Sequence, residues 1–293
     1  MAAHHTTAST DRPAVSTPFT AATVDVAHIV VPLDGSPFAE RALPVAAWAA
    51  DATGARLRLV EVVHSDEEAE GATRYLDAVT RQRHAHAWDV LRGDDVPAVL
   101  AEAVTAVTGG LACLATHGRD RSVAVLGSVA ASVLDASDRP VLLAGPSAQP
   151  VEPTDAPVVV AVDGTDRDER LMPVALGWAA RLGRRLLVVT VAEPAPPGPR
   201  GAPSRARGPD DPEGYVASLA ARSTGTGVTV EGQVVYDPVS VRDGLVPHLD
   251  RVAALVVVGS RRRDGLPRLV LGTHAARLVH DAPVPALAVP LQD

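Results

Sequence analysis

The chain repeats itself, and this repeat restricts its fold more than any other feature of its 293 residues. Shifted by 129 residues, VPLDGSPFAERALPVAAWAADATGARLRLVEV aligns with VAVDGTDRDERLMPVALGWAARLGRRLLVVTV. Shifted by 145 residues, GSVAASVLDASDRPVLLA aligns with GTHAARLVHDAPVPALAV. The duplication predicts two homologous domains, the second of which carries extra sequence in its middle.

Each repeat alternates short apolar runs, such as HIVVPL and LVVVG, with longer helical segments. Strands alternating with helices of about 10 to 15 residues form βαβ units, whose right-handed crossovers produce a parallel sheet covered by helices. We therefore expect an α/β fold with two tandem domains, each a five-stranded, mainly parallel sheet with flanking helices. Ligands bind such sheets beyond the carboxyl ends of the strands, where the strand order reverses.

Changes in composition suggest the domain boundaries. Residues 1–27 are rich in Thr, Ser and Ala without periodicity, which predicts a disordered N-terminal arm. The first domain is expected over 28–145, a proline-bearing linker over 146–156 and the second domain over 157–291. The extra sequence of the second repeat is a Pro/Gly/Arg-rich insert at 194–213.

The composition argues against several classes of function. A net charge of −8 and an aromatic content of 3% are unfavourable for a nucleic-acid binder. Apolar runs are shorter than the roughly 18 to 20 residues that cross a bilayer, so we expect a cytoplasmic protein with no membrane partner. All 27 basic residues are arginine, which removes lysine-dependent phosphate sites and Schiff bases. Cys113 is the single cysteine, and its apolar surroundings predict a buried structural thiol.

Two motifs recur where strands are expected to end. Asp34 and Asp163 follow the first strand of each repeat, in VPLDGS and VAVDGT. Later in each repeat, ATHGRDRSVAVLGS and GSRRRDGLPRLVLGT place glycines between a strand and a helix. Glycine lets the backbone approach an anion, and free N–H groups at a helix start bind that anion without lysine. The residues leave a structural alternative open, in which the aspartates only make turns and Ser128 and Thr273 only cap helices.

Together these motifs resemble the universal stress protein family over nearly all of residues 28–290, as two tandem domains. The resemblance implies Rossmann-like (adenine nucleotide alpha hydrolase-like) domains and a site for ATP, or for ADP or AMP, with Mg²⁺ as a candidate companion of the nucleotide. The phosphates would lie on the glycine loop and the next helix, and the aspartate would contact the nucleoside. The resemblance also implies that the last strands can pair, as an internal pseudo-dimer or in a homodimer.

The candidate nucleotide-binding residues occupy related places in the two repeats, and no catalytic residue or metal ligand is assigned. In the first domain they are Pro32, Leu33, Asp34, Val62, Ala115, His117, Gly118, Gly127, Ser128 and Val129. In the second domain they are Ala161, Val162, Asp163, Val191, Gly259, Arg261, Arg262, Gly272, Thr273 and His274.

Each repeat departs from the family's loop pattern, which is Gly, two residues, Gly, nine residues, Gly, then Ser or Thr. The first repeat has Ala115 at the first glycine and only eight residues between Gly118 and Gly127. The second keeps the spacing but has Arg262 at the central glycine. Three readings of Arg262 stay open: it binds phosphate, it fills the pocket, or it belongs to a solvated loop with no ligand.

The function expected from these features is nucleotide-dependent sensing or regulation under stress, with an unidentified regulatory protein partner. Rapid catalysis is not expected, because no residue is recognisable as a general base. Two alternatives remain at this point: a slow ATPase, and a nucleotide-free interaction module with degenerate loops.

Overall fold

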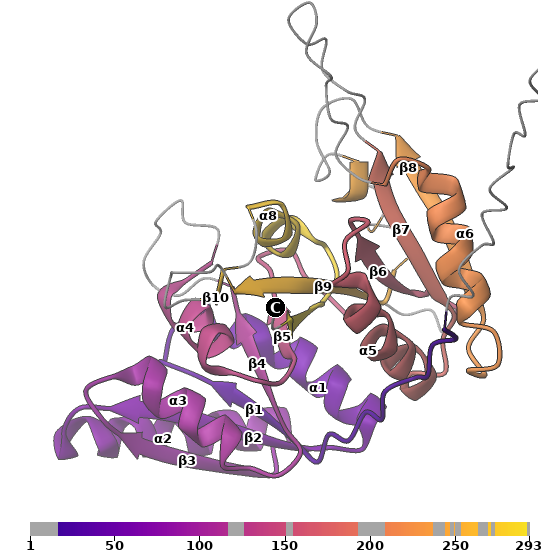
Figure 1. Cartoon of the computed structure of the whole chain (residues 1–293). Helices are drawn as coiled ribbons and strands as arrows, with labels where there is room; N and C mark the ends of the chain where they lie inside the picture. The colour runs from indigo at the N-terminus through magenta and orange to yellow at the C-terminus, as the bar shows by residue number, and fades with distance from the viewer. Residues whose placement is uncertain are drawn as a thin grey trace, which may run out of the picture.

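The computed structural model is a continuous sheet of strands between two layers of helices (Figure 1). The sheet contains 11 strands, ten of them in the order β3-β2-β1-β4-β5-β11-β9-β6-β7-β8, while β10 pairs with β9 outside this path. The structure describes residues 17–116, 126–150, 155–192, 209–236, 244–246, 249, 253–262, 269–270 and 273–291.

The first half of the chain forms five parallel strands in the order 3-2-1-4-5. Its strands are β1 (His28–Pro32), β2 (Arg56–Val63), β3 (Ala87–Arg92), β4 (Gly110–Ala115) and β5 (Val141–Ala144). Its helices are the 3-10 turn η1 (Ala39–Arg41), α1 (Ala42–Thr53), α2 (Asp66–Arg83), α3 (Val96–Thr105) and α4 (Ser128–Ala136).

The second half repeats this topology with its own five parallel strands. These are β6 (Val158–Val162), β7 (Leu186–Ala192), β8 (Val230–Tyr236), β9 (Leu255–Arg262) and β11 (Ala286–Leu291). The short strand β10 (Leu269–Val270) pairs antiparallel with β9. Its helices with described bounds are α5 (Asp168–Arg181), α6 (Pro212–Arg222) and α8 (Thr273–Asp281), and residues 244–246 are also helical. The expected α/β class and parallel five-stranded sheets are confirmed. Helix α6 begins at Pro212, so the last two residues of the predicted insert 194–213 are helical, and its residues 194–208 lie outside the described part.

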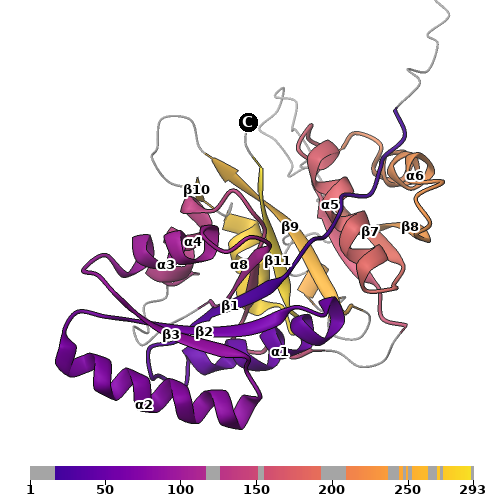
Figure 2. The same cartoon turned by 90° about the horizontal axis from the view of Figure 1, so that it is seen from below.

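The central strands are buried on both faces because they are nearly continuous runs of Val, Leu, Ile and Ala. Helices α1, α2, α5 and α6 pack on one face of the sheet, and α3, α4 and α8 pack on the other (Figure 2). Among the strands whose burial is described along their full length, the edge strands β3 and β8 are the most exposed. The fold thus has two apolar layers, one on each side of the sheet.

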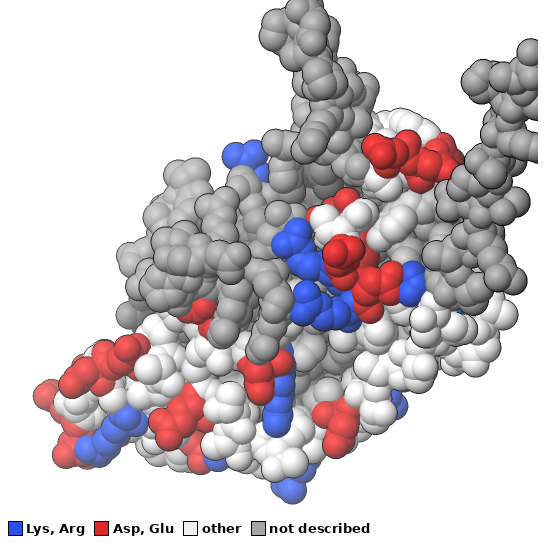
Figure 3. Space-filling model, in the orientation of Figure 1, with Lys and Arg blue, Asp and Glu red and all other residues white. Residues whose placement is uncertain are grey.

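Charged side chains on the described surface pair locally. Arg58 contacts Asp89 at 2.6 Å, and Arg185 contacts Glu231 at 2.9 Å. On the face shown in Figure 3, blue and red side chains of the described residues are interspersed rather than gathered by sign. Exposed pairs of this kind contribute at most about 1 kcal/mol each, so the fold depends mainly on its apolar layers.

The two halves join through their last strands. Strands β5 and β11 pair antiparallel, with Ala286 opposite Leu143, Leu287 opposite Leu142 and Ala288 opposite Val141. Because residues 141–143 correspond to 286–288 in the repeat, exchanging the halves maps this pairing onto itself. Leu142 and Leu287, both fully buried, therefore sit on a pseudo-two-fold axis. This pairing is the internal arrangement that the resemblance implied.

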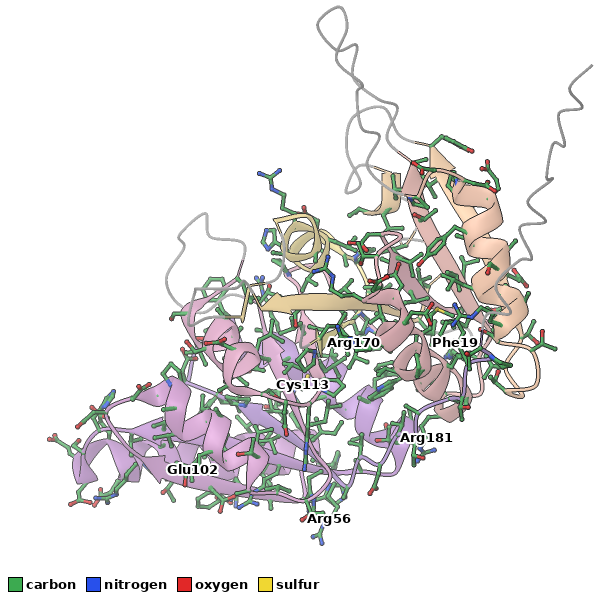
Figure 4. The ribbon with its side chains drawn as sticks, in the orientation of Figure 1. Phe19, Arg56, Glu102, Cys113, Arg170 and Arg181 are labelled. Atoms are coloured by element: carbon green, nitrogen blue, oxygen red, sulfur yellow. The ribbon has the colours of Figure 1, made fainter. Side chains whose placement is uncertain are left out.

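Residues 17–27 are not a disordered arm as predicted; they lie along the second half before entering β1 (Figures 1 and 2). Phe19 is only 8% exposed, and the guanidinium of Arg222 lies over its ring at 4.0 Å from the centroid. The Phe19 N–H donates to the Arg222 carbonyl at 2.8 Å. Figure 4 shows Phe19 beside α5 and α6. We call residues 17–27 the N-terminal strap.

A glycine on α5 makes room for the strap. The Ala22 N–H donates to the Pro173 carbonyl at 2.8 Å, and the Ala22 carbonyl lies where a Cβ on Gly177 would stand. At its other end the strap bonds to the first half, where the Ala27 N–H donates to the Gly109 carbonyl at 2.9 Å. The strap therefore spans the two halves on one face of the sheet.

The only cysteine, Cys113, is fully buried in the core beside α1, which confirms the predicted buried thiol. Burial raises the pKa of its thiol. Because the thiolate is the reactive form, we expect no modification of the native chain by a thiol-reactive dye at about pH 8, and full modification in denaturant. Stoichiometric labelling of the native protein on mixing would contradict this packing.

Candidate functional site

In each half the strand order reverses beside the first strand. β1 lies between β2 and β4, and β6 lies between β7 and β9. The helix after β1 packs on one face of the sheet and the helix after β4 on the other, so the point where the strand order reverses lies between their first turns. This is the position at which open α/β sheets bind ligands.

Asp34 and Asp163 form matching turns at these strand ends. In the first half, the Ser36 N–H and hydroxyl donate to Asp34 Oδ1 at 3.0 and 2.5 Å. In the second half, the Thr165 N–H and hydroxyl donate to Asp163 Oδ1 at 3.2 and 2.5 Å. Both aspartates are exposed, so each presents a carboxylate at the end of the first strand of its half.

The glycine after each aspartate is required by the turn. Gly35 has a φ of 72° and Gly164 a φ of 80°, a region that side chains with a Cβ rarely adopt. A Cβ on Gly164 would also meet Pro209 at 3.0 Å. The backbone conformation of this turn therefore requires the glycine of the Asp-Gly pair in both halves.

The first half also places a helix start where its strand order reverses. Gly127 caps α4, and its N–H donates to the carbonyl of the buried Thr116 at 2.6 Å. Ser128 is the first helical residue, so it is not the cap that the sequence suggested. The first N–H groups of a helix have no partner within it and carry its positive dipole end, which suits an anion.

Apolar side chains line the strand ends of the first half. Leu33 is 4% exposed, and Pro32, Ala115, Val62 and Val129 are partly buried. Val62 comes from β2 and Val129 from α4, and both pack against the core on the α4 face. An apolar wall next to a carboxylate and a helix N-terminus can hold a flat base, a sugar and a phosphate respectively.

The second half has the same wall but a different fourth strand. Val162 and Val191 are 6% and 7% exposed, and Ala161 is partly buried. Gly259 lies within β9, opposite Val289 of β11, and the strand continues through Arg261 and Arg262. There it pairs with β10, with Leu269 opposite Arg262 and Val270 opposite Arg261.

The backbone of Arg262 is thus extended rather than looped. An arginine in a strand needs no positive φ, so its backbone is not strained at this position. Strand β10 packs against α4 of the first half (Figure 1), which brings the β9–β10 segment of one half to the other. Thr273 and His274 open α8, and their backbone is all that is described.

The model of one family, "Universal stress protein family", matches residues 26–145 and 156–290. The chain belongs to this family. A universal stress protein of Mycobacterium tuberculosis is 29% identical over 301 residues, which covers 88% of this chain and 93% of the relative.

Solved universal stress proteins have the same fold. A crystal structure from Archaeoglobus fulgidus DSM 4304 superposes with a TM-score of 0.67 at 18% identity, covering 90% of this chain and 98% of that one. At this identity the likeness shows the fold alone. A second structure from Archaeoglobus fulgidus, in complex with dAMP, is 23% identical over 47% of this chain and 99% of that one, with a TM-score of 0.36.

Several predicted site residues of this universal stress protein lie outside the described part. His117 and Gly118 of the first half and Gly272 of the second half are among them. The side chains of Arg261, Arg262, Thr273 and His274 are also not described. The described residues nevertheless bring together the aspartate turn and apolar wall in both halves, and the capped helix start in the first.

Asp168 is a buried residue of the second site that sequence reasoning missed. It is 3% exposed, and its Oδ2 accepts the N–H groups of Asp163 at 3.1 Å and Gly164 at 2.9 Å. The Tyr215 hydroxyl donates to the same oxygen at 2.7 Å. The repeat alignment hid this residue because it pairs Asp168 with Ala39. The sequence feature that could have revealed it is an acidic residue four positions after the glycine of the Asp-Gly pair.

Burial raises the pKa of the Asp168 carboxyl from an ordinary 3.8 to about 6 against the effect of its hydrogen bonds. A carboxyl whose pKa is raised by folding stabilises the fold below about pH 4, and this contribution is lost as the pH rises through about 6. Ionisation of Asp168 therefore makes the native state less stable at neutral pH than at low pH, as far as this one group is concerned.

The described residues contain no group of three or more His, Cys, Asp or Glu side chains that could hold a metal ion. Among the described helices, none is long and apolar enough to cross a membrane.

Proposed function

We propose that this protein binds an adenine nucleotide, ATP or else ADP or AMP, in at least one half and acts as a stress-response regulator or sensor. One observation carries the proposal: the Asp34 turn and the Gly127-capped start of α4 follow the adjacent strands β1 and β4 at the point where the strand order reverses. A cytoplasmic location, a regulatory protein partner and a homodimer belong to the same proposal.

The chemistry of the first site suits each part of such a ligand. The N–H groups at the start of α4 provide the phosphate site without lysine, the exposed Asp34 can accept bonds from ribose hydroxyls, and Val62 and Val129 offer an apolar surface to the base. This arrangement would bind a nucleotide and fix its orientation. The described residues provide no evident general base for its hydrolysis.

The second half departs from the first at one part of this site. Its aspartate turn and apolar wall match, but β9 continues as a strand to Arg262 where the loop pattern expected a glycine turn. This difference favours the first half as the stronger site. A nucleotide-free interaction role for the second half is therefore the competing function.

The test measures ATP, ADP and AMP binding to the full chain by calorimetry, with GTP as the specificity control. Gly127→Asp should raise the ATP Kd of the first site by at least about tenfold, because aspartate caps α4 well but places a carboxylate beside the phosphate. Asp34→Ala should weaken the same site. The matched control is Asp51→Ala, an exposed aspartate near the far end of α1.

Two results would count against the proposal. One is a purified full chain that carries no nucleotide and shows no heat of binding with ATP, ADP or AMP. The other is ATP binding that survives Gly127→Asp and Asp34→Ala combined with Asp163→Ala, which would locate the ligand elsewhere. ATP turnover above background, abolished by the same changes, would identify the slow ATPase instead.

A further inference from the structure

We propose that Asp168, together with Tyr215, is the positioning residue of the second half's nucleotide site and fixes the 163–165 turn for nucleoside contact. The inference deepens the proposed function and depends on it. Among the described residues, Asp168 is the buried carboxyl beside this turn, and nucleotide binding by the Asp-Gly turn alone gives it no role.

The hydrogen bonds of Asp168 go to the turn rather than to its own helix. An acidic residue at a helix start usually stabilises that helix, yet the start of α5 has no side-chain cap. Asp168 Oδ2 instead accepts the main-chain N–H groups of Asp163 and Gly164, the pair that presents the candidate nucleoside contact. A charged acceptor holds such donors more strongly than a neutral one, so the carboxylate fixes the orientation of Asp163.

The first half lacks this device. Ala39 occupies the aligned position, and its N–H donates to the hydroxyl of Ser36 at 3.2 Å. The tyrosine on the second helix of that half, Tyr75, donates to Glu40 at 2.9 Å. The two halves thus hold similar aspartate turns by different means.

The environment of Asp168 sets the direction of a pH effect. Asp163 faces it from the end of β6 and Tyr215 from α6, while Glu169 is paired with Arg222 of α6. Because burial raises the pKa of the Asp168 carboxyl to about 6, it gains a proton as the pH falls through this value. The neutral carboxyl is a weaker acceptor, so the turn loosens and the second site binds nucleotide less tightly in acid.

The experiment isolates the second site in a full chain carrying Gly127→Asp and measures ATP binding by calorimetry at several pH values. If only the ionised form holds the turn, the Kd should rise about tenfold between about pH 7.5 and pH 5. Asp168→Asn keeps an oxygen acceptor without the titration, so its pH profile should lose this rise. Protonation of the ATP phosphates occurs for both variants and therefore cancels in the comparison.

Two further variants separate positioning from folding. Asp168→Ala removes the acceptor and should raise the Kd by about tenfold or more at neutral pH. Asp168→Asn, whose amide is neutral like the protonated carboxyl, should bind at every pH about as weakly as the Asp168 chain does in acid. Tyr215→Phe removes one donor and should weaken the second site about threefold. Tyr75→Phe, its matched control, should leave the first site unchanged when measured in a chain with Asp163→Ala.

Each outcome decides between the two proposals. Equal pH profiles for the Asp168 chain and Asp168→Asn, or full affinity in Tyr215→Phe, would overturn the positioning role and leave nucleotide binding intact. Suppose that the unaltered chain binds one ATP and the Gly127→Asp chain binds none. This result would also overturn the positioning role, and it would restrict the proposed function to the first half. No ATP binding by the unaltered chain would overturn both.

Discussion

Replacing Leu142 or Leu287 by alanine is expected to lower the free energy of unfolding by about 2 to 5 kcal/mol each, because each change removes a fully buried side chain from a packed core. These two leucines lie opposite each other where β5 meets β11, and both belong to the same apolar layer. Chemical denaturation monitored by circular dichroism measures the effect.

The double variant tests whether the two leucines act as a unit across the joined halves. Their combined effect should differ from the sum of the single effects by about 0.5 to 3 kcal/mol, as expected for residues in contact. Leu59→Ala is the matched control: it empties an equally buried position on β2, three strands away from β5. The effects of Leu59→Ala and Leu287→Ala on the free energy of unfolding should add within about 0.5 kcal/mol. Additivity of Leu142 and Leu287 would show that the antiparallel pairing does not couple the halves.

Gly177→Ala should release the N-terminal strap and lower the free energy of unfolding by about 1 to 3 kcal/mol. Alanine in a helix interior normally stabilises by up to about 1 kcal/mol relative to glycine. At Gly177, however, the new methyl group would occupy the place of the Ala22 carbonyl, which is backbone and cannot rotate away. Loss of the strap would then expose Phe19.

A second glycine gives the matched control. Gly71 lies within α2 with no atom within 4 Å of its added Cβ, so Gly71→Ala should stabilise the protein. Chymotrypsin supplies an independent readout, because Phe19 is buried in the native chain and should be cut faster only in Gly177→Ala. If both alanine variants gain stability and resist cleavage equally, the strap is not docked on α5.

The sequence predicted most of the fold because its signals were local and repeated. Apolar runs such as VVVAV and LVVVG can hardly be anything but buried strands when helices of regular length separate them. The strap was missed for the opposite reason. Its attachment rests on one aromatic side chain and on main-chain bonds to Pro173 and Gly109, which the composition of residues 1–27 does not reveal.

The candidate site was predictable only where the two repeats agree. Asp34 and Asp163 were found because the Asp-Gly pair recurs, and the structure gives both the same turn. Asp168 was not found, since its partner in the repeat is alanine. The loop around Arg262 was expected to turn, but main-chain pairing with β10 and β11 extends the strand instead. Pairing between segments that are far apart in the chain cannot be predicted from the local sequence.

The pairing of β5 with β11 inside one chain has a consequence for how the two sites can change over evolutionary time. In a dimer of identical subunits, a codon change alters both sites at once, so a substitution harmful to either is removed by selection. In the fused chain each half mutates alone while its neighbour keeps the shared sheet intact. Ala115 and Arg262 at different loop positions, and Asp168 on one side only, are the kind of one-sided differences that this genetic independence permits.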